Sequence, residues 1–176
     1  MITKGVYSAT CSILNDDFSL NVDATIDHAS SSISGGLHGV IFFGSTGQSQ
    51  LIDLNSKKSL IYKISSHKLR KNFFLGTGCN SLKETLDLIK YGFEYEFKDF
   101  LIMPPAYYKG NSEQGVYDFY KHIIEKIPKI RIVLYNFEKL SSFLFTPEFV
   151  SKLVSDFPKN IIGVKDSSYN LYENLK

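Results

Sequence analysis

The sequence predicts an α/β protein with parallel strands. Short apolar segments bounded by Gly, Pro or small polar residues recur along the chain, and each is too short for a typical helix. They do not alternate cleanly between apolar and polar residues, which is typical of strands buried on both faces. Helical patterns separate them, and this alternation indicates parallel βα units. The predicted strands are Gly5–Thr10, Gly39–Phe43, Asn72–Leu75, Phe100–Met103, Arg131–Leu134 and Ile161–Val164.

Capping residues mark the predicted helices. Asn80 is a candidate N-cap for a helix that Gly92 would end, and Thr146 followed by Pro147 is a strong helix start. The other helical patterns run from Asn55 toward Arg70, cover Asp23–Ser34 more weakly, and place Phe119, Ile123, Ile124 and Ile127 on one face before Pro128. No linker interrupts the pattern, so we expect residues 1–176 to form a single domain. The pattern alone does not separate an open doubly wound sheet from a closed (β/α)₈ barrel.

Composition narrows the classes of function. The 20 basic and 18 acidic residues are mixed along the chain, so we expect neither a nucleic-acid nor a membrane partner. Cys11 and Cys79 are isolated, and the 4 histidines are scattered, so we expect no metal site and no cofactor. Unpaired thiols, with no signal peptide or apolar run of membrane-spanning length, predict a cytoplasmic protein.

Polar residues follow several predicted strands, which is where α/β proteins place their functional groups. These segments are Gly44–Ser49, Pro104–Lys109, Tyr135-Asn136 and Lys165–Ser168. Because the carboxyl ends of parallel strands meet at one edge of a sheet, the four segments are expected to lie near one another.

Lys165 continues an apolar strand, so its side chain is expected to leave the sheet beside the core. Poor solvation disfavours the ammonium form, and a neutral amine attacks a ketone to form a Schiff base. The competing interpretation is an ordinary lysine paired with Asp166 or extended into solvent. Tyr135 is ambiguous in the same way, since a strand-end phenol can be a structural hydrogen-bonding group or a proton shuttle.

Two glycine-containing turns could bind anions. Gly44–Ser49 offers backbone N–H groups and hydroxyls that suit a carboxylate or a phosphate, but it lacks the Gly-Lys-Ser/Thr of a P-loop. Gly76-Thr77-Gly78 is a weak dinucleotide-binding signal, because Ser81 stands where a third glycine is expected. Either segment could be a plain βα turn.

Taken together and in order, these motifs resemble the dihydrodipicolinate synthase / N-acetylneuraminate lyase family of class I pyruvate-dependent aldolases. The resemblance runs from Gly5 to about Asn170. Its motifs are Gly44-Ser45-Thr46-Gly47-Gln48, Gly76-Thr77-Gly78, Pro104-Pro105-Ala106-Tyr107-Tyr108-Lys109, Tyr135-Asn136 and Gly163-Val164-Lys165-Asp166-Ser167-Ser168.

The resemblance implies a (β/α)₈ TIM barrel, of which this chain covers about the first six βα units. By position, Lys165 matches the lysine that forms an imine with pyruvate, and Tyr135 matches the tyrosine that moves protons. The segment Ser45-Thr46-Gly47 matches the turn that holds the pyruvyl carboxylate, with Ser45 also in the proton relay. Tyr108 matches an aromatic residue that a neighbouring subunit contributes to this relay. A homotetramer built as a dimer of dimers is implied as well.

The sequence departs from the synthase pattern after the fifth strand. Glu138 stands at the family's proline position, and Leu140 stands where synthases have the arginine that grips the second substrate's carboxylate. Ser45 resembles the lyase branch, and Gln48 replaces a usual glutamate. These departures favour cleavage or condensation of a 2-oxo-3-deoxy sugar acid with pyruvate and an aldehyde. The alternatives are dihydrodipicolinate synthesis from pyruvate and aspartate semialdehyde, a non-catalytic 2-oxo acid binding module, and a nucleotide-binding open sheet.

Length is the largest departure, since a (β/α)₈ barrel typically needs about 250 residues. The seventh and eighth strands are not in the 176-residue sequence, so the first and sixth strands would present unpaired edges. We therefore expect this length of chain, by itself, to be poorly stable and weakly active or inactive.

Overall fold

A computed structural model of the chain describes residues 4–169. The six predicted strands are present and form one parallel sheet. The strands are β1 (Tyr7–Ala9), β2 (Gly39–Phe42), β3 (Phe73–Gly76), β4 (Asp99–Ile102), β5 (Arg131–Asn136) and β6 (Ile161–Asp166).

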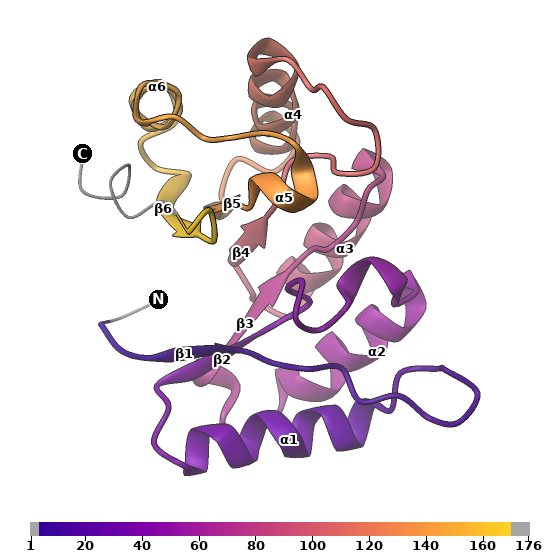
Figure 1. The fold of residues 1–176 in the computed structure, drawn as a ribbon. Helices are drawn as coiled ribbons and strands as arrows, with labels where there is room; N and C mark the ends of the chain where they lie inside the picture. Colours follow the sequence, from indigo (N-terminus) through magenta and orange to yellow (C-terminus); the bar gives the residue numbers. More distant parts are fainter. Residues whose placement is uncertain (1–3, 170–176) are drawn as a thin grey trace.

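Strand order decides between the two parallel architectures that the sequence left open. The order is β1-β2-β3-β4-β5-β6, so each strand pairs with the next one along the chain. A doubly wound sheet requires a reversal of strand order, and this sheet has none. Figure 1 shows the sheet curving from β1 to β6 with the long helices around its outside. The prediction of the first six βα units of a barrel is confirmed, and the open nucleotide-binding sheet is wrong.

Across residues 4–169, five long helices cover the outer face of the sheet. They are α1 (Val22–Ser34), α2 (Leu54–Ser65), α3 (Leu82–Glu94), α4 (Glu113–Lys126) and α6 (Pro147–Asp156). Each begins after a polar residue whose side chain accepts a backbone N–H of the first turn, which satisfies an otherwise unpaired donor. The short elements are the helix α5 (Glu138–Ser141) and the 3₁₀ turns Ser49–Leu51 and Arg70–Asn72.

The predicted boundaries of two helices are wrong. The cap of α3 is Ser81 rather than Asn80, and Gly92 lies inside the helix. A Cβ at Gly92 would come 2.7 Å from the ring of Phe100, so this glycine permits close helix–strand packing and does not end the helix. The cap of α2 is Asp53, whose carboxylate accepts hydrogen bonds from Ser56, and the helix ends well before Arg70.

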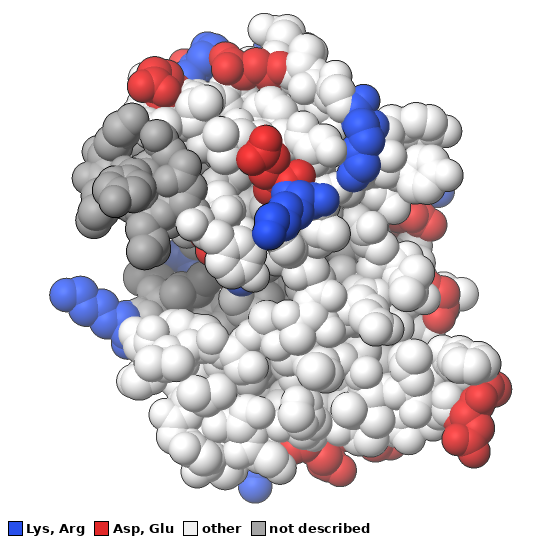
Figure 2. Space-filling model, viewed as in Figure 1, with Lys and Arg blue, Asp and Glu red and all other residues white. Residues whose placement is uncertain are grey.

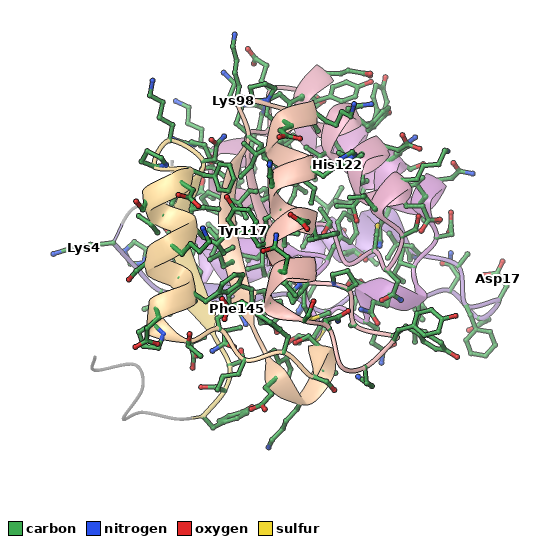
Figure 3. The ribbon with its side chains drawn as sticks, turned by 90° about the horizontal axis from the view of Figure 1, so that it is seen from above. Lys4, Asp17, Lys98, Tyr117, His122 and Phe145 are labelled. Atoms are coloured by element: carbon green, nitrogen blue, oxygen red, sulfur yellow. The ribbon has the colours of Figure 1, made fainter. Side chains whose placement is uncertain are left out.

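The core lies between the helices and the outward-facing side chains of the strands. Val40, Phe42, Leu75 and Ile102 in the sheet are all but inaccessible to solvent. Burial of this apolar surface against the helices is the main stabilising contribution to the fold. Figure 3 shows α4 and α6 with Tyr117 between them, and the Tyr117 hydroxyl donates to Asp156 at 2.9 Å.

Alternation along β6 separates a helix-facing side from a concave side. Ile162 and Val164 are 40% and 42% exposed. Side chains of a strand alternate between faces, so Gly163 and Lys165 point to the concave side of the sheet. The sheet thereby directs a lysine away from the helices and into the interior of the curve.

Within residues 4–169, no helix is both long and apolar enough to cross a membrane. The same residues contain no group of three or more His, Cys, Asp or Glu side chains that could hold a metal ion.

Candidate active site

A cavity of about 600 Å³ lies at the carboxyl ends of the strands. Its lining comes from residues 43–46 and 48–51 after β2, from Gly78 after β3, from Leu101 and Met103 at β4, and from the end of β5, the start of α5 and the end of β6. Figure 2 shows the molecule hollowed on the side where β1 and β6 lie, with acidic and basic side chains interspersed on the visible face. Three of the four polar segments expected to converge contribute to the described lining, and Pro104–Lys109 does not.

Lys165 enters this cavity from β6. Its Nζ donates to the Ser167 hydroxyl at 3.0 Å and lies 4.1 Å from the centre of the Tyr135 ring. Asp166, the partner considered in the competing interpretation, accepts a hydrogen bond from Asn136 at 2.6 Å and others from Ser168. Consecutive strand residues face opposite sides, so Lys165 is directed to the cavity and Asp166 to the other face.

Tyr135 links the lysine to the turn after β2. It is the register partner of Lys165 across β5 and β6 and is 5% exposed. Its hydroxyl is 2.7 Å from Ser45 Oγ, a contact between residues 90 positions apart, and either oxygen could be the donor. The fold thus brings Ser45, Tyr135 and Lys165 into one connected group.

The Gly44–Ser49 turn is held against the segment that follows β1. Ser12 Oγ donates to the Gly47 carbonyl at 2.6 Å, and a Cβ at Gly47 would lie 2.9 Å from the Thr10 carbonyl oxygen. Only glycine allows this approach, so Gly47 anchors the turn from behind and is not among the described lining residues. Ser45 and Thr46 line the cavity. Carboxylate binding by Ser45, Thr46 and Gly47 stays a prediction.

Tyr108 lies outside the cavity of its own chain. It is 80% exposed and packs edge-on against Tyr107, with 5.2 Å between ring centres. Its predicted role in a neighbouring subunit's relay stays a prediction.

Sequence reasoning missed several lining residues. Ser167 lies in the Lys165–Ser168 segment expected at the site but was given no role there; its hydroxyl accepts a hydrogen bond from Lys165 Nζ. Leu51 and Phe137 carry no such signal, since they reach the cavity through the 3₁₀ turn Ser49–Leu51 and the start of α5.

The departures from the synthase pattern fall at the rim. Leu140 lines the cavity and is 38% exposed, and the Lys109 ammonium donates to its carbonyl oxygen at 2.6 Å. Lys139 lies over the Tyr169 ring, 5.1 Å from its centre. Among the described residues that line the cavity, Lys165 is the one charged side chain. Glu138 is exposed at the start of α5.

The Gly76-Thr77-Gly78 turn binds the side chain of Lys57 from the same chain. The carbonyl oxygens of Thr77 and Gly78 both accept hydrogen bonds from Lys57 Nζ at 3.0 Å. Burial lowers the pKa of Lys57, and the Cys79 thiol partly opposes that shift. A turn whose carbonyls converge on an ammonium is not a phosphate cradle, which agrees with the strand order.

Comparison with known proteins gives the family. The chain matches the family model described as "Dihydrodipicolinate synthetase family" over residues 2–176. It is 31% identical to a 4-hydroxy-tetrahydrodipicolinate synthase of Thermus thermophilus, over 79% of this chain and 46% of that protein. It is 34% identical to the corresponding synthase of Legionella pneumophila strain Philadelphia 1, over 77% of this chain and 46% of the relative. The chain therefore spans about half the length of the relatives it matches.

Solved structures give the same result. Dihydrodipicolinate synthase from Agrobacterium tumefaciens superposes with a TM-score of 0.89 at 26% identity, over 98% of this chain and 61% of that one. The 2-keto 3-deoxygluconate aldolase from Picrophilus torridus superposes with a TM-score of 0.84 at 25% identity, again over 98% and 61%. The fold, the motif order and the match along the sequence agree, and the chain belongs to the dihydrodipicolinate synthetase family.

Proposed function

We propose that the protein is a class I aldolase in which Lys165 forms a Schiff base with pyruvate and a 2-oxo-3-deoxy sugar acid is cleaved or formed. The observation that carries this proposal is the contact series from Lys165 Nζ to the Tyr135 ring and from the Tyr135 hydroxyl to Ser45 Oγ. A lysine in a cavity beside a phenol that is itself hydrogen-bonded has both components of imine chemistry, a nucleophile and a proton carrier.

Imine formation assigns a step to each group. The neutral amine of Lys165 attacks the ketone carbon of pyruvate, and the ketone oxygen takes a proton to become a hydroxyl. Loss of that hydroxyl as water, with the nitrogen lone pair forming the C=N bond, gives the protonated imine. Tyr135 supplies and recovers the protons, with Ser45 as its hydrogen-bonding partner. The imine then accepts the electron pair when the bond to the aldehyde carbon breaks, and returns it when that bond forms.

Lys165 must lose its charge before it attacks. At rest, Lys165 Nζ lies over the face of the Tyr135 ring and donates to the Ser167 hydroxyl. We propose that the incoming ketone displaces Lys165 Nζ from the ring and from the Ser167 hydroxyl as the amine is deprotonated.

The side chains at the rim of the cavity indicate which class of aldehyde the protein accepts. A leucine at position 140 cannot form a bidentate contact with a carboxylate, and no other charged side chain lines the described part of the cavity. Among the lining residues not assigned to the pyruvyl group, the side-chain amides of Gln48 and Gln50 can hydrogen-bond a polyhydroxy chain instead. The similarity to a structure named as a 2-keto 3-deoxygluconate aldolase supports this assignment, and the similarity to named synthases keeps semialdehyde condensation as the second candidate.

We further propose a cytoplasmic homo-oligomer built as a dimer of dimers, without nucleic-acid or membrane partners. Both cysteines are free thiols, which suits a reducing compartment. An exposed tyrosine pair at Tyr107 and Tyr108 suits an aromatic contact with a neighbouring subunit.

The test is a comparison of substrates. Pyruvate release from a panel of 2-oxo-3-deoxy sugar acids is measured beside condensation of pyruvate with aspartate semialdehyde. Release from at least one sugar acid, at a kcat/KM above that for the semialdehyde, is the expected result. A preference for the semialdehyde would make the protein a synthase. Capture of pyruvate on Lys165 with no turnover of either kind would make it a 2-oxo acid binding module.

A further inference from the structure

A second lysine lies behind the cavity. Lys57, in the first turn of α2, is 2% exposed and is among the largest fully buried side chains. Its Nζ donates to the Thr77 and Gly78 carbonyls at 3.0 Å and to the Cys79 sulfur at 3.6 Å, and lies 5.8 Å from the centre of the Phe43 ring. The hydrogen-bonding capacity of one ammonium is fully used by these three acceptors.

This position is costly for a cation. Burial of an ammonium is unfavourable without a carboxylate partner, and among residues 4–169 none forms an ion pair with Lys57. Asp53 and Glu84 act on it only at longer range. The first turn of a helix is also its positive end, so the helix dipole opposes a lysine there. A neutral side chain would avoid both costs, which points to a role for the charge.

The contacts of Lys57 lead directly to the cavity wall. Gly78, whose carbonyl it holds, lines the cavity and has a φ of +53°. A Cβ at Gly78 would come 2.1 Å from Ser49 Oγ and 3.1 Å from the Phe43 carbonyl oxygen. Gly78 therefore packs on both ends of the turn at Gly44–Ser49, and Phe43 leads into that turn with a φ of +61°. Lys57 thus fixes the wall against which the turn lies.

We propose that Lys57 is a positioning residue for the carboxylate of the 2-oxo acid, because it fixes Gly78 and Ser49 behind the binding turn and places a poorly solvated positive charge there. This inference rests on the proposed function, since it assumes that the turn holds a carboxylate. A unit charge behind the binding turn, at an effective dielectric constant of about 20, is expected to change anion affinity on the order of tenfold.

The test separates charge from shape with two small ketones. Borohydride trapping on Lys165 is measured in the full chain as a function of pyruvate, which carries the carboxylate, and of acetone, which does not. Lys57→Met should raise the half-saturating concentration of pyruvate about tenfold and leave that of acetone within about twofold. Lys57→Arg keeps the charge and should restore most of the pyruvate affinity. Thermal melts are recorded for each variant.

The possible failures are distinguishable. A wild-type protein that traps neither ketone removes the proposed function itself. The next outcomes apply if the wild type traps both ketones. An equal rise in the half-saturating concentrations of pyruvate and acetone in Lys57→Met would show that Lys57 only supports packing. An unchanged half-saturating concentration of pyruvate would show that Lys57 has no role in binding, and either result overturns the inference. Should Lys57→Met not fold, Lys57→Gln retains donors for the carbonyls without the charge and is compared in the same way. Failure of all three variants to fold would show a structural role only, against the inference.

Discussion

Lys165 and Lys57 lie on either side of one cavity wall, and their surroundings differ. Lys165 projects from the end of β6 into open space and contacts a hydroxyl and the face of a ring. Lys57 projects from α2 into a closed site where backbone carbonyls and a thiol surround it. The contacts of Lys165 are with side chains that a substrate can displace, whereas those of Lys57 are with the backbone that forms the wall.

Burial alone therefore does not make a lysine a nucleophile. A reacting amine needs a free path for the ketone and a proton carrier nearby, and of these two lysines Lys165 has both. The N–H groups of Lys57 all donate to acceptors in the cavity wall. Lys57 can therefore affect a ligand only by positioning the wall and through the electrostatic field of its charge.

Replacing the reacting lysine should have the largest effect. Lys165→Met removes the amine while keeping a flexible side chain of similar length, so kcat/KM for sugar-acid cleavage should fall at least about 10³-fold. Lys139→Met at the rim is the matched control, and it should stay within a few-fold of wild type. Comparable losses in both variants would mean that general surface charge, rather than one amine, supports turnover.

Removing the Tyr135 hydroxyl should slow proton transfer at Lys165. Tyr135→Phe keeps the ring beside the ammonium but removes the hydroxyl that contacts Ser45, so kcat should drop about 10²-fold with little change in KM. Tyr117→Phe also loses a hydrogen-bonded hydroxyl, to Asp156 between α4 and α6, and should keep normal kcat. Steady-state kinetics decide, and an unaltered kcat in Tyr135→Phe would remove the tyrosine from the proton relay.

Substitutions at the rim of the cavity test which aldehyde the protein accepts. Leu140→Arg adds a guanidinium where the cavity opens, and kcat/KM for aspartate semialdehyde should rise about tenfold because a charged hydrogen bond to its carboxylate becomes possible. Leu51→Arg places the same charge elsewhere on the rim and should give a smaller gain. Equal gains would show that the charge acts over the whole rim, with no specific contact at position 140.

The smallest expected effect is a pH dependence of stability. Burial lowers the pKa of Lys57 below its ordinary 10.5, so the unfolded chain binds more protons than the folded chain between the lowered pKa and 10.5. The free energy of unfolding of the wild type, relative to Lys57→Met, should therefore rise with pH in that window and stay level below it. Urea unfolding at a series of alkaline pH values measures this difference. Arginine at position 57 stays protonated throughout, so the free energy of unfolding of Lys57→Arg, relative to Lys57→Met, should not rise with pH. A decrease of this free-energy difference with pH in the wild type would contradict the desolvation of Lys57.

Much of the fold could be predicted from the sequence because strand burial leaves a local signal. Apolar segments such as Phe100–Met103 identify strands without any knowledge of their neighbours. Strand order and the closing curvature are long-range properties, so the choice between barrel and open sheet needed the pairing of β1 through β6 or the family resemblance. Boundaries failed where one of two adjacent polar residues became the cap, as at Ser81, or where a glycine served packing, as at Gly92.

In the candidate site, local motifs likewise identify residues, whereas their contacts depend on long-range packing. Lys165, Tyr135 and Ser45 could be found because each follows a strand within a short motif. Their mutual contacts depend on strand register and could not be read from spacing alone. Lys57 was missed entirely, since a lysine in a helical pattern ordinarily lies at the surface, and only packing of α2 against the turn after β3 buries it.

Borohydride reduction with pyruvate, followed by peptide mass mapping, tests the division between the two lysines most directly. The expected product is one pyruvyl adduct, located on Lys165, with the peptide that contains Lys57 unmodified. An adduct on Lys57, or a folded protein that carries none on Lys165, would contradict the assignment of the reacting amine.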